Sequence, residues 1–80
     1  MVEVFKTNVT HNEQANFLIK EIDKYFLEYN VNFDLNDCDK ILRVKCDMGI
    51  VQSSLIIALL ENFGFTSEIL SDDLEMIENE

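Results

Sequence analysis

Residues 31–46 read VNFDLNDCDKILRVKC, two alternating runs on either side of a polar turn. In each run, apolar side chains stand at every second position: Val31, Phe33 and Leu35, then Leu42, Val44 and Cys46. Alternation of this kind is typical of a strand with one buried face. Residues 36–40, between the runs, are rich in Asn and Asp, which favour turns. The stretch therefore predicts an antiparallel hairpin with strands at 31–35 and 42–46.

A helical periodicity precedes the hairpin, and a second one follows it. Over residues 13–29, apolar side chains recur at three- and four-residue steps, and Thr10 or Asn12 suits the N-cap. Over residues 49–63 the spacing is again helical, and Gly64 stands where a helix often ends in the left-handed conformation. We therefore expect two helices, one on each side of the hairpin.

Short strand-forming segments flank these helices at residues 1–7 and 66–70. Lys6 breaks the alternation of the first segment, which predicts either a bulge or an exposed strand end. The order strand, helix, strand, strand, helix, strand predicts an α+β fold of the ferredoxin-like βαββαβ type. Its four-stranded antiparallel sheet would carry both helices on one face. Eighty residues suffice for one domain, expected at 1–70.

The chain is strongly acidic, with a formal net charge of -10. Such a field repels nucleic acid and anionic membrane surfaces, so neither is an expected partner. Residues 71–80 hold five of the sixteen acidic residues, which predicts a solvated C-terminal tail or, alternatively, a contact with a basic partner. No apolar run reaches the ~18 residues of a membrane-spanning helix. Two unpaired cysteines favour a reducing compartment, so the expected location is the cytoplasm.

Three short segments carry a family resemblance. Residues 8–14, after the first expected strand, read NVTHNEQ; residues 33–35 read FDL before the hairpin turn; residues 64–65 read GF after the second helix. In order and spacing they resemble the heavy-metal-associated (HMA) domain of small copper chaperones and metal-pumping ATPases. In that family the loop reads Gly-Met-Thr-Cys-x-x-Cys, and the other segments read Val-Asp-Leu and Gly-Tyr. The resemblance covers residues 2–70 and implies the same ferredoxin-like fold.

The loop departs from the family at the two metal-binding positions. After the shared Thr10, His11 and Gln14 stand where the family has its cysteines. Cu(I) is a soft cation that prefers thiolate sulfur, for which an imidazole and a neutral amide are poor replacements. We therefore expect no cofactor and no tight Cu(I) site, and His11 is then a polar loop residue. The alternative is a divergent metal-binding protein or metallochaperone that holds a divalent ion weakly through His11 and its acidic neighbour Glu13.

Other reactive side chains do not form a recognisable catalytic set. Cys38 lies in the expected turn and Cys46 at the far end of the next strand, roughly 26 Å away at ~3.3 Å per residue. A disulfide needs Cα atoms within about 7 Å, so we expect an exposed Cys38 and a core Cys46. The chain has one histidine, no Gly-rich phosphate loop and no nucleophile motif. We therefore expect no enzyme activity.

The second helix carries more apolar surface than a sheet can cover. If Ile56, Ile57 and Leu60 face the sheet, Leu55 and Leu59 face elsewhere. Either the first helix or the tail covers them, or they form an exposed patch of the kind that marks protein contacts. Three further side chains are expected to add apolar surface on other faces: Phe5, Phe17 and Ile41. The expected function is a non-enzymatic HMA-like module that binds a protein partner or associates with itself.

Overall fold

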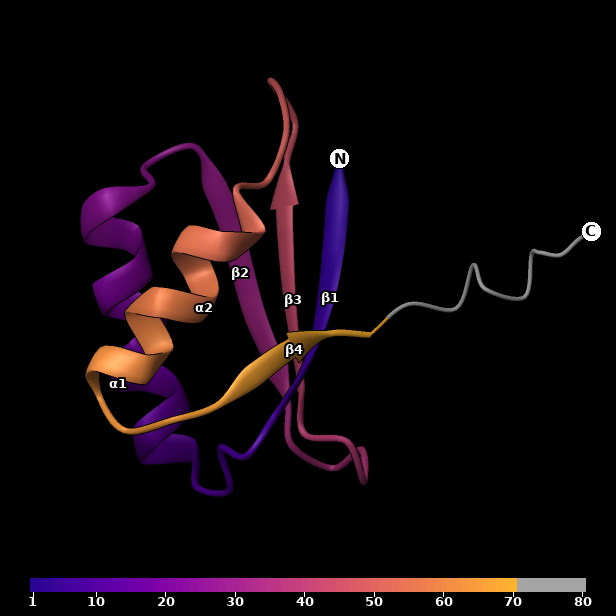
Figure 1. The fold of residues 1–80 in the computed structure, drawn as a ribbon, viewed down its shortest axis with the longest axis vertical. Helices are drawn as coiled ribbons and strands as arrows, with labels where there is room; N and C mark the ends of the chain where they lie inside the picture. Colours follow the sequence, from indigo (N-terminus) through magenta and orange to yellow (C-terminus); the bar gives the residue numbers. More distant parts are fainter. Residues whose placement is uncertain (71–80) are drawn as a thin grey trace, which may run out of the picture.

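The computed structural model describes residues 1–70, and the acidic segment 71–80 lies outside the described residues. The elements, in chain order, are β1 (Val2–Thr7), α1 (Asn12–Tyr25), β2 (Tyr29–Asp34), β3 (Ile41–Cys46), α2 (Ser53–Asn62) and β4 (Ser67–Ile69). The strands form one antiparallel sheet in the order β2-β3-β1-β4. Both helices lie on the same side of it (Figure 1). The expected ferredoxin-like α+β arrangement is confirmed.

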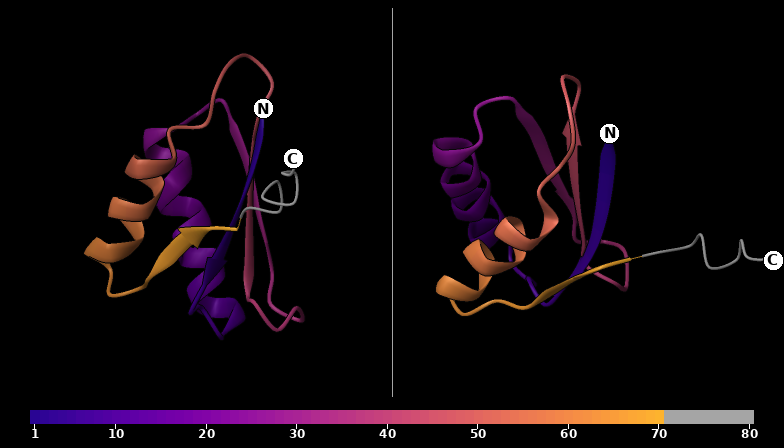
Figure 2. Two further views of the ribbon diagram at one scale, coloured as in Figure 1. Left: turned by 45° about the vertical axis from the view of Figure 1, so that its right-hand side comes forward. Right: turned by 45° about the horizontal axis from the view of Figure 1, so that its top comes forward.

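The face of the sheet under the helices forms the core. Phe5 of β1 pairs with Leu42 of β3, which pairs with Phe33 of β2. Because directly opposite residues share a face, the three side chains form one apolar row. The helices and loops add further side chains to this core: Val9, Ala15, Leu18, Ile22, Val51, Ile56 and Leu60. Figure 2 shows the other face of the sheet with no helix against it.

Two of the three apolar residues expected on the surface belong to the interior. Phe5 is 0% exposed because it lies on the face of β1 that the helices cover. Ile41 lies on the opposite face, but it sits in an inner strand between Lys6 and Asp34 and is only 4% exposed. The prediction of surface exposure is wrong for both, whereas Phe17 is exposed as expected.

The first helix is shorter than its periodicity predicts. Its N-cap is His11, neither Thr10 nor Asn12, and its last residue is Tyr25. Tyr29, which the periodicity places in the helix, is instead the first residue of β2. Spacing alone could not show this, because Tyr29 is buried in either case.

Tyr29 is held at the start of β2 by contacts from distant parts of the chain. Its ring stacks on Phe26 with centroids 4.8 Å apart. Its hydroxyl accepts a hydrogen bond from the Gln52 N–H at 2.9 Å and donates one to the Ile50 carbonyl at 3.3 Å. These bonds hold residues 47–52 as a loop, so α2 begins at Ser53 and not at residue 49 as expected.

The end of α2 agrees with its sequence signal. Gly64 has φ +87°, the left-handed conformation that glycine adopts most readily. The Gly64 N–H donates to the Glu61 carbonyl and the Phe65 N–H to the Leu60 carbonyl, both at 3.0 Å. This pair of bonds is a Schellman motif, which satisfies two carbonyls at the end of the helix. The chain then turns back into β4.

The pairing of β1 decides between the two structures that Lys6 left open, a bulge or an exposed strand end. β1 pairs with β3 in an unbroken register from Val2 to Lys6, so β1 has no bulge and Lys6 is exposed on the uncovered face. β4 is shorter than expected, at three residues. In the described part of the chain, neither helix has the length and apolar character needed to cross a bilayer.

Candidate functional site

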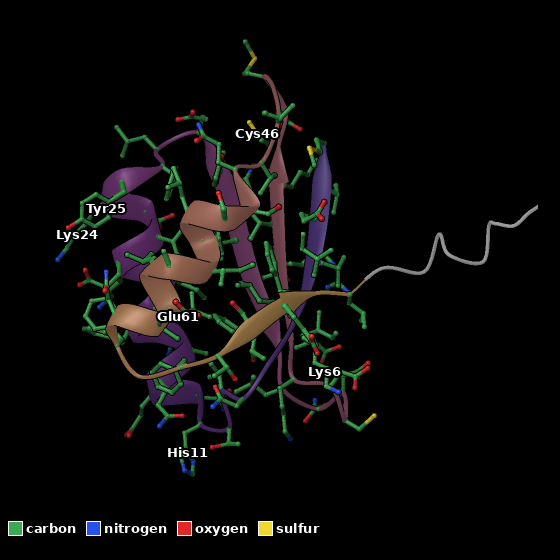
Figure 3. All side chains as sticks on the ribbon, viewed as in Figure 1. Lys6, His11, Lys24, Tyr25, Cys46 and Glu61 are labelled. Atoms are coloured by element: carbon green, nitrogen blue, oxygen red, sulfur yellow. The ribbon has the colours of Figure 1, made fainter. Side chains whose placement is uncertain are left out.

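The β1–α1 loop, which was compared with the HMA metal-binding motif, lies at one end of the molecule. Figure 3 shows His11 there, pointing away from the sheet, and its side chain is exposed. The Gln14 side-chain oxygen accepts hydrogen bonds from the backbone N–H groups of Thr10 (3.3 Å) and His11 (3.2 Å). Gln14 therefore completes the N-terminus of α1, which otherwise has unpaired N–H groups. Its oxygen is already occupied by these bonds.

The described residues hold a different cluster with metal-ligating chemistry. Ligand atoms of Asp37, Cys38 and Asp39 lie within 4.8 Å of one another in the hairpin turn, and this group includes neither His11 nor Glu13. The Asp37 carboxylate accepts the Asp39 N–H at 2.9 Å. This contact within the turn accounts for the cluster without a ligand. The weak divalent-metal site at His11 and Glu13 stays a prediction.

The two cysteines lie where the hairpin predicts. Cys38 is exposed in the turn, Cys46 is buried at the end of β3, and both are free thiols. Cys46 packs with the apolar core. Cys46 lies at the opposite end of the sheet from the β1–α1 loop. The turn that holds Cys38 adjoins the end of β1, because the Thr7 N–H donates to the Asp39 and Lys40 carbonyls.

A groove of about 380 Å³ runs between α2 and the C-terminal end of α1. It is lined by Tyr25, Phe26, Leu55, Ala58, Leu59 and Asn62. None of these side chains is charged, although the chain carries a net charge of -10. Of the two leucines singled out from the sequence, Leu55 is 47% exposed, while Leu59 is half-buried and packs against the core. The structure therefore brings both to one apolar groove.

The apolar surface continues along the two helices beyond the groove. Phe17 of α1 and Phe63, just after α2, meet edge to face with ring centroids 4.9 Å apart. Both rings remain exposed, by 43% and 39%. Within α2 the one charged residue is Glu61. Exposed apolar side chains thus occur on both helices, although most exposed residues of α1 are polar or charged.

Charge at the groove is confined to its edge. Lys24, next to Tyr25 on α1, forms an ion pair with Glu21 at 2.9 Å. The hydrogen bond and the charge of Glu21 raise the pKa of Lys24 above its ordinary value. Figure 3 shows Lys24 and Tyr25 on the side of α1 that faces away from the sheet. An apolar centre with a polar rim is the usual anatomy of a protein contact surface.

A second pocket is lined by polar side chains and lies where the end of β1 pairs with the start of β4. It measures about 350 Å³ and is lined by Lys6, Thr7, Asn8, Thr66, Ser67 and Glu68. Asn8 and Thr66 bond to each other: the Asn8 N–H donates to the Thr66 carbonyl at 3.3 Å, and the Thr66 N–H donates to the Asn8 side chain at 2.9 Å. The Ser67 hydroxyl is buried without a hydrogen-bond partner. This pocket contains no catalytic pair of side chains.

Sequence reasoning missed the exposure of Tyr25. The helical spacing allowed Tyr25 or Phe26 on the buried stripe, and no local signal distinguishes two adjacent aromatic residues. In the structure Tyr25 is 67% exposed and Phe26 is half-buried. It also missed the exposed Ile50 (70%), which lies in the stretch expected to begin the second helix, and Met48 (87%), just before that stretch.

Comparison with known proteins identifies no relative of this chain. The chain matches no protein-family model, and searches of curated proteins and of solved structures find no similar protein. The likeness to heavy-metal-associated domains therefore rests on the residues of the β1–α1 loop, the hairpin and the end of α2.

Proposed function

We propose that this chain is a non-enzymatic protein-interaction or self-association module whose contact surface is the groove between α1 and α2. On this proposal, the HMA-like scaffold serves to present a helix face and does not carry metal. The observation that carries the proposal is the uncharged lining of the groove, with Leu55 and Tyr25 exposed at its mouth.

The energetics of the groove support a binding role. When a partner covers exposed leucine and tyrosine side chains, apolar area is removed from water. Each Å² removed stabilises the complex by about 25 cal/mol. Aromatic and large apolar side chains at the centre of a contact commonly supply most of its affinity. An amphipathic helix or an apolar segment of a partner fits such a groove between two helices. A surface that only faced water would not need an uncharged strip on so acidic a chain.

The chemistry of the loop supports the absence of metal transport. His11 and Gln14 supply an imidazole and an amide where the family uses two thiolates, and the amide oxygen of Gln14 is bonded to the backbone. A soft cuprous ion gains little from such ligands. Loss of metal transport removes the constraint on that loop but leaves the helix face free to evolve as a contact surface.

The proposal is tested with two neighbouring substitutions in the full-length chain. Leu55→Glu puts a charge into the groove, whereas Ser54→Glu puts the same charge on the exposed flank of the same helix. We expect a partner captured by the wild-type chain, then identified and purified, to bind Ser54→Glu normally and Leu55→Glu at least tenfold more weakly. For self-association, sedimentation equilibrium should show the same difference. Equal behaviour of the two variants in both assays would contradict the proposal.

A further inference from the structure

β2 is an edge strand without the usual protection against pairing. The sheet order places it at one border, and in residues 1–70 no strand pairs with its outer side. Natural edge strands are kept apart by short length, bulges, proline or lysine. β2 has six residues in unbroken register with β3, and its only charge is Asp34 at its end. The opposite edge, β4, has only three residues.

The direction of the backbone groups in β2 follows from a pair of hydrogen bonds between Met1 and the end of β3. The Cys46 N–H donates to the Met1 carbonyl at 2.8 Å, and the Met1 amino group donates to the Cys46 carbonyl at 2.7 Å. Cys46 therefore directs its groups toward β1. Along an antiparallel strand, successive residues direct their groups to alternate sides. Lys45 and Arg43 consequently direct theirs toward β2.

The residues of β2 opposite them are Asn30 and Asn32. The backbone groups of these two residues are used in bonds to β3, so Val31 and Phe33 direct their N–H and C=O groups off the edge of the sheet. Tyr29 differs, because its N–H already donates to the Phe26 carbonyl. The open edge thus presents two adjacent donor–acceptor pairs.

A second copy of the same edge satisfies all of these groups in one register. If two β2 strands run antiparallel about a twofold axis at Asn32, Val31 of one copy lies opposite Phe33 of the other. Each such pair exchanges two hydrogen bonds, as in a normal antiparallel ladder. Val31 and Phe33 are half-buried in the single chain, so their side chains also cover one another.

The side chains on the uncovered face fit the same register. Asn32 meets Asn32 at the axis, and Asn30 of one copy lies opposite Asp34 of the other. Amide–amide and amide–carboxylate pairs can hydrogen-bond, and no like charges are placed opposite each other. In a chain with a net charge of -10, a strand with a single charged residue at its end is a place where two copies repel each other weakly.

We propose that two copies of this chain associate through β2, antiparallel about Asn32, and form one continuous sheet. This contact is separate from the groove between α1 and α2, which stays open in both copies. The interface is isologous, so the assembly closes at two copies and does not grow into a fibre.

Charge substitution at the axis gives the first test. In the full-length chain, Asn32→Lys places two ammonium groups across the axis, where facing Cα atoms are about 4.5 Å apart. By sedimentation equilibrium we expect a wild-type dimer and an at least tenfold weaker Asn32→Lys dimer. Asn16→Lys, on the exposed side of α1, adds the same charge elsewhere and should leave the dimer intact.

A charge-swap experiment keeps the test independent of any folding defect. Asn32→Asp alone should also weaken the dimer, whereas an equal mixture of Asn32→Lys and Asn32→Asp should form a mixed dimer. Restoration on mixing shows that residue 32 of one copy faces residue 32 of the other. A monomeric wild type, or homodimers of both variants as tight as the wild type, would overturn the proposal.

Hydrogen exchange locates the contact without substitution. The Val31 and Phe33 amides should exchange more slowly as protein concentration rises through the dimerisation range. The Asn30 and Asn32 amides, bonded to β3, should be protected at every concentration. Concentration-independent exchange at Val31 and Phe33 would contradict the pairing. Failure of the groove proposal appears separately, as an unchanged Leu55→Glu variant.

Discussion

The Tyr29 hydroxyl lies 2.9 Å from the Gln52 nitrogen and accepts its hydrogen bond just before the first turn of α2. Tyr29 opens β2, so the bond joins the edge of the sheet to the helix that lines the groove. Tyr29 is 5% exposed, and the bond itself is partly buried. The position of α2 over the sheet therefore depends on a side chain more than twenty residues earlier in the sequence.

We expect Tyr29→Phe to destabilise the fold by about 1 kcal/mol, the usual net contribution of an intramolecular hydrogen bond. The ring should keep its stacking on Phe26. Urea unfolding of the full-length chain measures the change. Tyr25→Phe, at an exposed position on α1, is the control and should be nearly neutral. Equal midpoints for the two variants would show that the hydroxyl bonds contribute nothing.

The two glycines should respond differently to alanine. Gly64 has φ +87°, which an L-residue adopts at a cost of about 1 kcal/mol, so Gly64→Ala should destabilise by that amount. Gly49 has no such conformation, and a Cβ there meets nothing within 4 Å. Gly49→Ala should therefore be neutral or slightly stabilising, because it restricts the unfolded chain. Thermal unfolding of both variants compares them, and the reverse ranking would refute this account of the end of α2.

Two leucines of α2 should differ in their contribution to stability, because one is packed in the core and the other is on the surface. Leu60 is 0% exposed, so Leu60→Ala should cost about 2–5 kcal/mol through lost burial and a cavity. Leu55 is 47% exposed, and Leu55→Ala should cost about 0.5 kcal/mol or less. Urea midpoints for the two variants provide the comparison. A large loss of stability at Leu55 would mean that this side chain serves the fold and is not available to a partner.

Metal titration tests the prediction that the β1–α1 loop holds no tight Cu(I) site. Because the thiolates are missing, we expect Cu(I) to be removed from the full-length chain by a weak competing chelator. Calorimetry with Zn²⁺ and Ni²⁺ on the wild type and on His11→Ala tests the alternative site at His11 and Glu13. Heat that is present in the wild type and lost in His11→Ala would favour the metal-binding alternative. Tight retention of one equivalent of Cu(I) would contradict the loss of metal transport.

Local pattern predicted the elements of this fold but not all of their ends. The hairpin is readable because Val31, Phe33 and Val44 alternate with polar residues in a strict period of two. The end of α1 is not, because Tyr29 fits a helical stripe as well as a buried strand position. Its assignment depends on bonds to Ile50 and Gln52, which only the folded chain brings close.

The groove between α1 and α2 was also predictable only in part. Surplus apolar residues in α2 indicated that Leu55 would not face the sheet, and it does not. The contribution of Tyr25 required the crossing of two helices, which no single stretch of sequence encodes. The open edge at Val31 and Phe33 required the strand order, since an inner strand would have the same alternation.

The most direct test of the claim that the groove is the contact surface is an NMR titration of the full-length chain. Changes in the amide chemical shifts show which residues contact the partner. Spectra are recorded as the purified partner is added or, for self-association through the groove, as the concentration of an Asn32→Lys chain, whose β2 contact is weakened, is raised. We expect the largest shifts on the groove, at Tyr25, Leu55 and Leu59, and none of them in Leu55→Glu. Shifts confined to the loop around His11, appearing only when a metal ion is added, would contradict the proposed function.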